Sequence, residues 1–553
     1  MGRKPEKKNS PAQRDSGIST LGLGSLGILR ILGGKTKNEN SPAQRDSIMS
    51  NLKLETENSL PQLDSKMSNL GHCPKNPLCP SYPSDLKSLE IFFSPSFKIR
   101  HQDYINSLVD SLNNKLINIE NLMKNIVNTW LECVHCGKQY DLEKVRYNCD
   151  CGGILDAKRD LSKIDGGKLK KLWESRWGMK RGALSSGVWR YKELILDVAE
   201  ELIVTRQEGN TRLYPAGKAA KYAGIKDFWL KHEGENPTGS FKDRGMTCGA
   251  TAARIYDAST VACASTGNTS ASMASYAVVG GMKSIIFIPE GKIAYGKLAQ
   301  ALAFGGITLQ IKGNFDDAME LVQEVCSKLN IYLLNSINPF RIEGQKAIGF
   351  EILQQLDWEV PDWFVIPGGN LGNNSALSKG LQELHELGII NKIPRIAVIQ
   401  AEGSNPLSRM WKNHTPYMPV KDPDTIATAI KIGNPVSWEK SLRGLEWCNG
   451  VVEDVTEQEI MDAKAMVDAA GIGAEPASCC SVAGAKKLVD MGVISPDAKV
   501  VGILTGNILK DPDAVVGYHK DTLGDMGIKG TYANKPQVIE PTLDAVKAAI
   551  LGR

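Results

Sequence analysis

Long apolar runs are absent from this sequence of 553 residues. A membrane-spanning helix needs about 18 or more consecutive apolar residues, so no such helix is predicted. A strong excess of one charge is also absent, because 66 Lys and Arg stand against 62 Asp and Glu, a formal net charge of +4. A balance this even does not favour a protein that binds nucleic acid through bulk positive charge.

Aromatic residues are absent from residues 1–70, although the chain holds 11 Phe, 10 Trp and 14 Tyr. A segment without aromatics has little apolar area to offset its ordering entropy, and we predict a largely disordered tail over residues 1–103. This tail carries the octapeptide NSPAQRDS twice, at Asn9–Ser16 and at Asn40–Ser47. The basic residues at positions 1–70 lack aromatic neighbours on which bases could stack, which favours a solvated tail over a nucleic-acid-binding one.

Apolar residues recur every three or four positions over residues 104–130. They are Ile105, Val109, Leu112, Leu116, Ile119, Met123, Ile126 and Trp130. This spacing predicts an amphipathic helix. Its apolar face either packs on its own domain or joins a second copy in an oligomer.

Four of the 12 cysteines form a cluster with two knuckle-like pairs. Cys133 and Cys136 form the first pair, and Cys149 and Cys151 form the second. Four thiolates can close a tetrahedral zinc site, so we predict a zinc-ribbon-like module over residues 131–156, with four free thiols as the alternative. The scatter of the other cysteines is typical of a reducing compartment and predicts a cytoplasmic protein.

Short β-rich runs alternate with helical stretches such as Asp316–Leu329 over residues 157–553. The runs are Thr260–Ser265, Ser284–Pro289, Ile307–Ile311, Trp363–Pro367, Ile396–Gln400 and Val500–Leu504. This alternation predicts an α/β fold with a mostly parallel sheet covered by helices on both faces. Functional residues in such folds lie just beyond the carboxyl ends of the strands.

Four motifs combine glycine with hydroxyl, amide or lysine side chains. They are NPTGSFKDRG (Asn236–Gly245), ASTGNTS (Ala264–Ser270), GGNLGN (Gly368–Asn373) and LTGN (Leu504–Asn507). The glycines of GGNLGN let backbone N–H groups converge on an anion at a helix N-terminus. Lys242 can attack a carbonyl group if burial lowers its pKa. Taken one at a time, the lysine also fits a surface position and the glycines also fit a tight turn.

Together the four motifs resemble those of the threonine synthases, which are pyridoxal-phosphate (PLP) enzymes of fold type II. The resemblance extends over about residues 129–553 and includes EGNTRLY (Glu208–Tyr214), NSINPFRIEGQK (Asn335–Lys346) and EPAS (Glu475–Ser478). It implies two open, parallel-rich sheets covered by helices, with PLP held between a large domain and a small one. The small domain would comprise approximately residues 250–345.

The resemblance also implies roles for individual residues. Lys242 would carry PLP covalently and move protons as the catalytic base and acid. Asn268 would contact the 3′-oxygen of the cofactor ring, and Thr505 would contact its nitrogen. The cofactor phosphate would be held by Gly369, Asn370, Leu371, Gly372 and Asn373. The substrate would be held by Ser265, Thr266, Thr269, Asn335, Ser336 and Arg341.

The implied activity is that of a lyase that converts O-phospho-L-homoserine and water to L-threonine and phosphate, the last step of threonine biosynthesis. One alternative is another fold type II enzyme acting on O-phosphoserine, serine or threonine, such as a cysteate synthase or a dehydratase. A second alternative is a zinc-ribbon protein that binds nucleic acid and has an inactive PLP fold. The family is often dimeric and its plant members respond to S-adenosylmethionine, so a homodimer and this effector are expectations.

Overall fold

The computed structural model describes residues 129–290, 295–313 and 315–551. The predicted tail and the predicted helix up to residue 128 lie outside this part of the chain. The prediction that the helix reaches Trp130 is wrong, because Thr129 and Trp130 belong to strand β1 (Thr129–Cys133) and pair with a neighbouring strand. Among the described helices, none combines the length and apolar character that crossing a membrane requires.

The four clustered cysteines lie in or beside a small antiparallel sheet with the order β2 (Gln139–Tyr140), β1, β3 (Leu155–Arg159). Leu131 and Leu155 are buried within it. Strand β3 pairs with β1 along its whole length as far as Arg159. The sheet therefore runs past residue 156, where the module was predicted to end, and we call residues 129–159 the four-cysteine module.

A larger sheet of six strands lies at the centre of the fold. Its order is β12 (Val451–Val455), β11 (Arg395–Ala401), β10 (Trp363–Pro367), β13 (Lys499–Leu504), β5 (Asp227–His232), β4 (Leu213–Pro215). Neighbouring strands are parallel except for β4 with β5. The strands that the sequence predicted in β10, β11 and β13 are confirmed.

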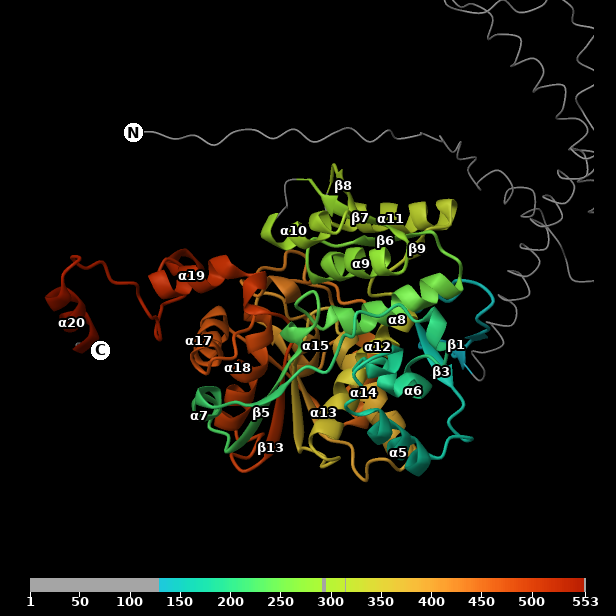
Figure 1. Ribbon diagram of the computed structural model, residues 1–553, viewed down its shortest axis with the longest axis horizontal. Helices are drawn as coiled ribbons and strands as arrows, with labels where there is room; N and C mark the ends of the chain where they lie inside the picture. The colour runs from blue at the N-terminus through green and yellow to red at the C-terminus, as the bar shows by residue number, and fades with distance from the viewer. Residues whose placement is uncertain (1–128, 291–294, 314, 552–553) are drawn as a thin grey trace, which may run out of the picture. The chain divides into compact units, whose positions relative to one another are not determined.

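Both faces of the large sheet are buried. Phe364 and Ile366 of β10 belong to one apolar core, whereas Trp363 and Val365 belong to another. Successive side chains of a strand point to opposite faces, so a strand between two helical layers is apolar at every position. Figure 1 shows one layer to the left of the sheet and the other to its right. The left layer contains α7 (Lys218–Ala223), α17 (Glu457–Ala469) and α18 (Pro476–Asp490), and the right layer contains α12 (Pro339–Gln345), α13 (Ala347–Gln355) and α14 (Gly372–Glu386).

A second, fully parallel sheet has the order β8 (Ile307–Ile311), β7 (Lys283–Pro289), β6 (Thr260–Ala264), β9 (Tyr332–Leu333). Helix α11 (Phe315–Leu329) packs on one face through Val322 and Cys326. Helices α9 (Asn268–Val279) and α10 (Tyr295–Ala303) contribute Met273 and Leu298 to the core on the other face. The predicted strands at β6, β7 and β8 and the predicted helix at α11 are confirmed.

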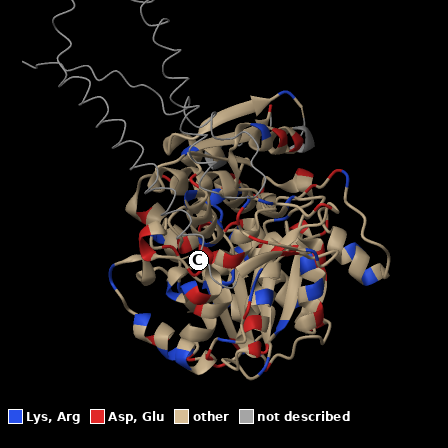
Figure 2. Cartoon of the chain, turned by 90° about the vertical axis from the view of Figure 1, so that its right-hand side faces the viewer, with Lys and Arg blue, Asp and Glu red and all other residues tan. Residues whose placement is uncertain are grey.

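Helix α8 (Lys242–Ile255) lies between the two sheets (Figure 1). The remaining α-helices within the described residues are α5 (Gly166–Arg176), α6 (Lys192–Ile195), α15 (Pro406–Asn413), α16 (Trp438–Trp447), α19 (Pro512–Lys520) and α20 (Leu543–Leu551). Helix α20 stands apart at the end of the chain, and none of its residues is buried. Basic and acidic residues are interspersed over the described chain (Figure 2), so recognition of an anion depends on individually placed groups.

A buried cluster of four charged side chains joins α8 to the large sheet. Arg244 donates to Glu233 through Nε at 2.6 Å and through Nη2 at 2.7 Å. Arg244 Nη2 also donates to Glu351 of α13 at 2.8 Å, and Lys231 of β5 pairs with the same carboxylate at 2.6 Å. All four side chains are fully buried. Two cations thus balance two anions inside the protein, where an unpaired charge would be costly.

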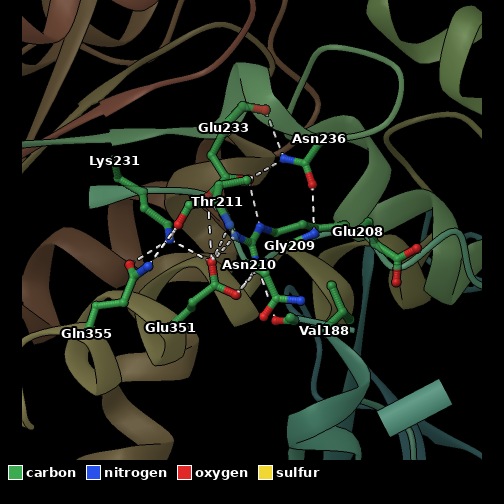
Figure 3. Close-up of polar contacts among 12 residues, drawn as sticks. Val188, Glu208, Gly209, Asn210, Thr211, Lys231, Glu233, Asn236, Glu351 and Gln355 are labelled. Atoms are coloured by element: carbon green, nitrogen blue, oxygen red, sulfur yellow. Dashed lines mark hydrogen bonds and ion pairs between the residues drawn. The ribbon is translucent and has the colours of Figure 1, made fainter. Parts of the chain in front are cut away.

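Backbone N–H groups complete this cluster (Figure 3). Glu351 accepts hydrogen bonds from the N–H of Asn210 at 2.8 Å and from that of Thr211 at 3.1 Å. Burial alone would raise the pKa of Glu351, but the charges of Arg244 and Lys231 hold that pKa below its usual range. The segment EGNTRLY, noted in the sequence, is therefore fastened to α8 through one ionised carboxylate.

Replacement of Arg244 by Met leaves Glu233 and Glu351 with Lys231 as their remaining cation inside the cluster. We expect Arg244→Met to lower the free energy of unfolding by about 3–5 kcal/mol, the usual cost of breaking a buried ion pair. Denaturation in urea measures the change. The control is Arg409→Met on the exposed face of α15, which should stay within about 0.5 kcal/mol of the parent protein. Equal stability of the two variants would contradict the prediction.

Candidate active site

Lys242 is the first residue of α8 and is half-buried. Its Nζ lies 4.2 Å from the centre of the Phe241 ring and makes no hydrogen bond or ion pair with the described residues. Burial and, to a smaller extent, the charge of Arg341 lower the pKa of Lys242 to about 7, although Glu475 acts in the opposite direction. A large fraction of the amine is therefore neutral near pH 7, as a nucleophile toward carbonyl groups requires.

The turn that presents Lys242 is held by its neighbour Asp243. Asp243 accepts hydrogen bonds from the backbone N–H of Thr238 at 2.7 Å, from its hydroxyl at 2.6 Å, and from the hydroxyl of Ser272 on α9. Burial raises the pKa of Asp243 to about 6 although all three donors oppose the rise. The segment before α8 and helix α9 are thus tied to the residue beside the lysine.

The segment Gly368–Asn373, which we call the phosphate loop, connects β10 to α14. Leu371 adopts a left-handed conformation with φ of 62° and caps α14. A Cβ added at Gly369 would lie 3.1 Å from Cα of Ile430, so a larger residue would crowd the loop. Both polar atoms of the Asn373 amide are buried without a partner among the described residues. A helix N-terminus with an unused buried amide suits an anion.

Asn370 fixes this loop to two other segments. Its side-chain oxygen accepts the N–H of Val436 at 3.3 Å, and its backbone carbonyl accepts the N–H of Ser437 at 3.2 Å. Its Nδ2 donates to the hydroxyl of Ser336 at 3.1 Å. Asn370 therefore acts from the centre of the loop as an anchor, and it brings the predicted substrate residue Ser336 beside the phosphate loop.

One carboxylate, that of Glu475, joins the two residues predicted to contact the cofactor ring. Asn268 Nδ2 donates to Glu475 at 3.2 Å, and the hydroxyl of Thr505 donates to it at 3.2 Å. Thr505 also contacts the hydroxyl of Ser478 at 3.0 Å. A Cβ added at Gly506 would lie 2.4 Å from Glu475 Oε1, so glycine alone fits beside this carboxylate.

The same strand end leads back to Lys242. The carbonyl of Thr505 accepts the N–H of Phe241 at 3.0 Å, and Ser240 forms a bridge with Gly506. Lys242, Asn268 and Thr505, from three separate motifs, are thus linked through Glu475 and Phe241. Sequence reasoning assigned no role to Glu475 or Ser478, although both stand in the EPAS segment, and their position beside Asn268 and Thr505 emerges from the fold.

Arg341 of α12 is a buried cation without a carboxylate partner among the described residues. Its side chain is 2% exposed, its Nη1 donates to the carbonyl of Leu334 at 3.0 Å, and its Nε is buried and unpaired. Burial lowers the pKa of Arg341 to about 10. A guanidinium that is desolvated and incompletely paired favours an anionic ligand.

The other predicted substrate residues differ in whether their side chains already make hydrogen bonds within the protein. Asn335 is fully engaged with Ala264, because its Oδ1 accepts the N–H at 2.9 Å and its Nδ2 donates to the carbonyl at 3.1 Å. Ser265 accepts the N–H of Gly267 at 3.2 Å. The hydroxyls of Thr266 and Thr269 are half-buried and make no hydrogen bond with the described residues. These hydroxyls lie at the N-terminus of α9, whereas Asn335 acts on the end of β6.

The predicted metal ligands Cys133, Cys136, Cys149 and Cys151 lie together, with all four sulfurs within 4.8 Å of one another. Two of the separations are 3.6 Å, between Cys133 and Cys151, and 3.5 Å, between Cys136 and Cys149. Tetrahedral zinc, with ligands at about 2.3 Å, would set its sulfurs about 3.8 Å apart. The four thiols therefore have the arrangement that a structural zinc ion needs.

These groups also fit PLP. The phosphate loop offers backbone N–H groups and an unpaired amide to a phosphate, and Lys242 offers an amine of low pKa to an aldehyde. Asn268 and Thr505 offer an amide and a hydroxyl close to both. The donor set therefore matches a ligand that carries a phosphate, an aldehyde and a polar ring.

The low pKa of Lys242 leads to a direct prediction. Reductive methylation with formaldehyde should label Lys242 at a rate that rises with pH and reaches half its maximum at about pH 7, because the neutral amine is the reactive form. Exposed lysines, with an ordinary pKa of about 10.4, should still gain reactivity above pH 9. Peptide mass spectrometry measures both rates in one sample. A half-point of Lys242 that coincides with that of the exposed lysines would contradict the prediction.

Comparison with known proteins agrees with this geometry. A family model described as pyridoxal-phosphate dependent enzyme matches residues 204–506. The threonine synthase of Methanosarcina acetivorans is 47% identical over 428 residues, which cover 76% of this chain and 99% of that protein. Threonine synthase 2, chloroplastic, of Arabidopsis thaliana is 38% identical over 421 residues, which cover 74% of this chain and 81% of that protein.

The solved structure of threonine synthase from Escherichia coli has the same fold, with a TM-score of 0.55 at 18% sequence identity. The match covers 76% of this chain and 99% of that one. The family model spans more than half of the chain, and the archaeal relative is matched over nearly its full length. This chain therefore belongs to the PLP-dependent enzymes of fold type II and, within them, to the threonine synthase family.

Proposed function

We propose that this protein is a lyase that converts O-phospho-L-homoserine and water to L-threonine and phosphate. The observation that carries the proposal is the presence of one low-pKa amine and two candidate anion sites, the phosphate loop with its unpaired Asn373 amide and the buried guanidinium of Arg341. A phosphorylated cofactor and a phosphorylated substrate would need two such sites. The relationship to threonine synthases over nearly their whole length supports the same reaction.

PLP, when bound, withdraws electrons from the carbon atoms of an attached amino acid and so makes their protons labile. We assign its phosphate to Gly369, Asn370, Leu371, Gly372 and Asn373. We assign the ring substituent and the ring nitrogen to Asn268 and Thr505, both held by Glu475. This shared carboxylate fixes the directions of the amide and the hydroxyl. It also offsets part of the lowering of the Lys242 pKa by Arg341.

Lys242 would bind the cofactor covalently and, once released by the substrate amine, would move protons at the substrate carbons. Its pKa of about 7 suits both directions of transfer, because the amine accepts a proton readily and returns it readily at neutral pH. The first turn of α8 keeps the lysine in position, since the next two residues, Asp243 and Arg244, are both hydrogen-bonded within the protein interior.

The substrate phosphate is assigned to Arg341 and Ser336, and the substrate carboxylate to Ser265, Thr266 and Thr269 at the start of α9. The helix N-terminus adds backbone N–H groups that favour a carboxylate. Asn335, also predicted as a substrate residue, is assigned here through its hold on Ala264, which fixes the end of β6 from which this hydroxyl-rich turn begins.

Further parts of the proposal rest on the family relationship and on the sequence. They are a homodimer, activation by S-adenosylmethionine, a cytoplasmic location, and a small domain of approximately residues 250–345 set into a catalytic region over residues 157–553. The relative from Arabidopsis thaliana supports the comparison with plant enzymes. A structural zinc ion on the four thiols is supported by their close grouping.

The choice of substrate can be tested with two phosphoamino acids. We expect purified protein supplied with PLP to release phosphate from O-phospho-L-homoserine and to form threonine in equal amount. Lys242→Ala should lose at least about 10²-fold in rate, the contribution of a positioned acid–base group. A phosphate assay and amino-acid chromatography measure both products. Release of phosphate from O-phosphoserine alone would instead identify the alternative enzyme of the same fold.

The assignment of Arg341 can be tested by Arg341→Met. Loss of a charge-assisted hydrogen bond costs about 1.5–3 kcal/mol, so kcat/KM for the phosphorylated substrate should fall by roughly 10- to 150-fold. Arg341→Lys keeps the charge but loses the planar fork, so its kcat/KM should lie between those of the parent protein and of Arg341→Met. The absorption of bound PLP monitors the cofactor site in each variant. Unchanged kcat/KM in Arg341→Met would remove this residue from the substrate site.

A further inference from the structure

Strand β3 of the four-cysteine module is fastened to the rest of the chain by buried ion pairs. Lys440 of α16 donates to the carbonyl of Leu155 at 2.6 Å and pairs with Asp156 at 2.9 Å. Arg443, about one turn further along α16, also pairs with Asp156. Burial alone would raise the pKa of Asp156, but the charges of Lys440, Lys379 and Arg443 hold that pKa below its usual range.

A second set of ion pairs fastens the other end of β3. Arg159 pairs with Glu343 of α12 at 3.2 Å. Lys379 of α14 donates to the carbonyl of Ala157 and pairs with Glu343 as well. The side chains of Arg159, Glu343 and Lys379 are at most 6% exposed. Three helices of the catalytic region, α12, α14 and α16, are therefore joined to one strand of the module by desolvated charges.

Two of these helices carry the groups assigned to the cofactor and the substrate. Helix α14 begins at Gly372 of the phosphate loop, and Lys379 lies about two turns further along it. Helix α12 carries Arg341 two residues before Glu343. A helix is stiff over so short a distance. A shift of Lys379 or Glu343 with β3 would therefore also displace the phosphate loop and Arg341.

The module also contacts the segment that anchors Asn370. His135 Nδ1 lies 3.8 Å from Glu439 at the start of α16. Just before that helix, Val436 and Ser437 donate their N–H groups to Asn370. The phosphate loop is therefore connected to the module from two sides, through α14 and through residues 436–439.

The cysteines are placed to control the position of β3. Cys133 ends β1 and pairs with Leu155, the first residue of β3, and Cys149 and Cys151 lie in the turn that leads into β3. A metal ion on the thiolates would cross-link β1 to this turn. Small sheets of this kind draw their folding energy from the metal, so its loss would release β3.

We propose that the four-cysteine module is a metal-dependent positioning element for the phosphate loop, and that Lys379 is the positioning residue that connects them. The inference rests on the proposed function, because it takes the phosphate loop as the site of the cofactor phosphate. Metal on the thiolates fixes β3, β3 fixes α12 and α14, and α14 holds the loop in the form that binds phosphate. The proposed route through the loop acts on the phosphate of the cofactor.

Thermodynamic linkage makes this coupling reciprocal. If zinc raises the affinity for PLP by a given factor, PLP must raise the affinity for zinc by the same factor. Typical coupling between two sites in one protein is about 5- to 150-fold. Two independent titrations must therefore agree on one number.

The experiment measures PLP affinity of the full-length protein with zinc present, after removal of zinc by a chelator, and after zinc is restored. We expect the dissociation constant of PLP to rise by about 5- to 150-fold without zinc and to recover on its return. Zinc affinity, measured by chelator competition, should rise by the same factor when PLP is bound. Circular dichroism monitors the fold of the large and small sheets throughout.

Pyridoxal, which lacks the phosphate, is the matched ligand control. It can react with Lys242 but cannot use the phosphate loop. Its affinity should change less than about twofold on zinc removal, well below the 5-fold lower limit of the expected coupling. Equal zinc dependence of pyridoxal and PLP would overturn the proposed route through the loop.

Lys379→Met tests the connection without touching the metal ligands. Glu343 retains Lys346 at 2.7 Å and Arg159 at 3.2 Å, so no carboxylate is left without a cation. The variant should bind PLP more weakly than the parent and should depend less on zinc, because only the connection through residues 436–439 is retained. The control is Lys487→Met on α18, where a partly exposed lysine pairs with Glu453 at 3.2 Å, outside the contacts described above. It should keep both the affinity and the zinc dependence.

The outcomes separate the two proposals. A protein that binds no PLP under any zinc loading would contradict the proposed function. A protein that binds PLP equally well with and without zinc, or that binds no zinc, would overturn this inference and leave the proposed function intact. If the zinc-free protein loses its overall fold, Lys379→Met with zinc bound decides the matter, because an unchanged PLP affinity in that variant overturns the inference.

Discussion

The paired charges of Arg244, Glu233, Glu351 and Lys231 are the interaction on which the arrangement around Lys242 depends. An ion pair in the interior must be complete, because either partner alone would carry a large desolvation penalty. This requirement fixes the first turn of α8 against β5 and α13 at the same time. Lys242, two residues earlier, is therefore held in a desolvated position by its neighbours. Its own amine makes no hydrogen bond or ion pair with the described residues.

Close packing of α8 on α12 then brings the guanidinium of Arg341 near Lys242. Cβ atoms added at Gly245 or Gly249 of α8 would lie 2.8 Å and 3.1 Å from atoms of Arg341, and one at Gly344 would lie 2.0 Å from the carbonyl oxygen of Arg244. Glycine at these crossings lets α8 and α12 approach until their backbones nearly touch. The guanidinium on α12 can then lower the pKa of the lysine on α8.

The sequence predicted the parts of this structure that depend on local pattern. The strands at β6, β7, β8, β10, β11 and β13 follow from apolar runs, and the motifs follow from glycine next to hydroxyl and amide residues. The role of Glu475 depends on contacts between segments far apart in the chain, as does that of Asn335 at Ala264, and local sequence patterns do not reveal such contacts. The predicted helix ran too far because Trp130 continues the apolar spacing, whereas its pairing with Lys158 places it in β1.

The other buried lysines of this protein affect which lysine can react with an aldehyde. Lys231, Lys346, Lys379, Lys440 and Lys464 are all buried, and each is bonded to a carboxylate. Their amines are buried and paired with carboxylates, so they are poor nucleophiles toward an aldehyde. The selective reactivity of Lys242 therefore depends on the rest of the interior as well. Lys242 differs from the other buried lysines largely because each of those is paired with a carboxylate.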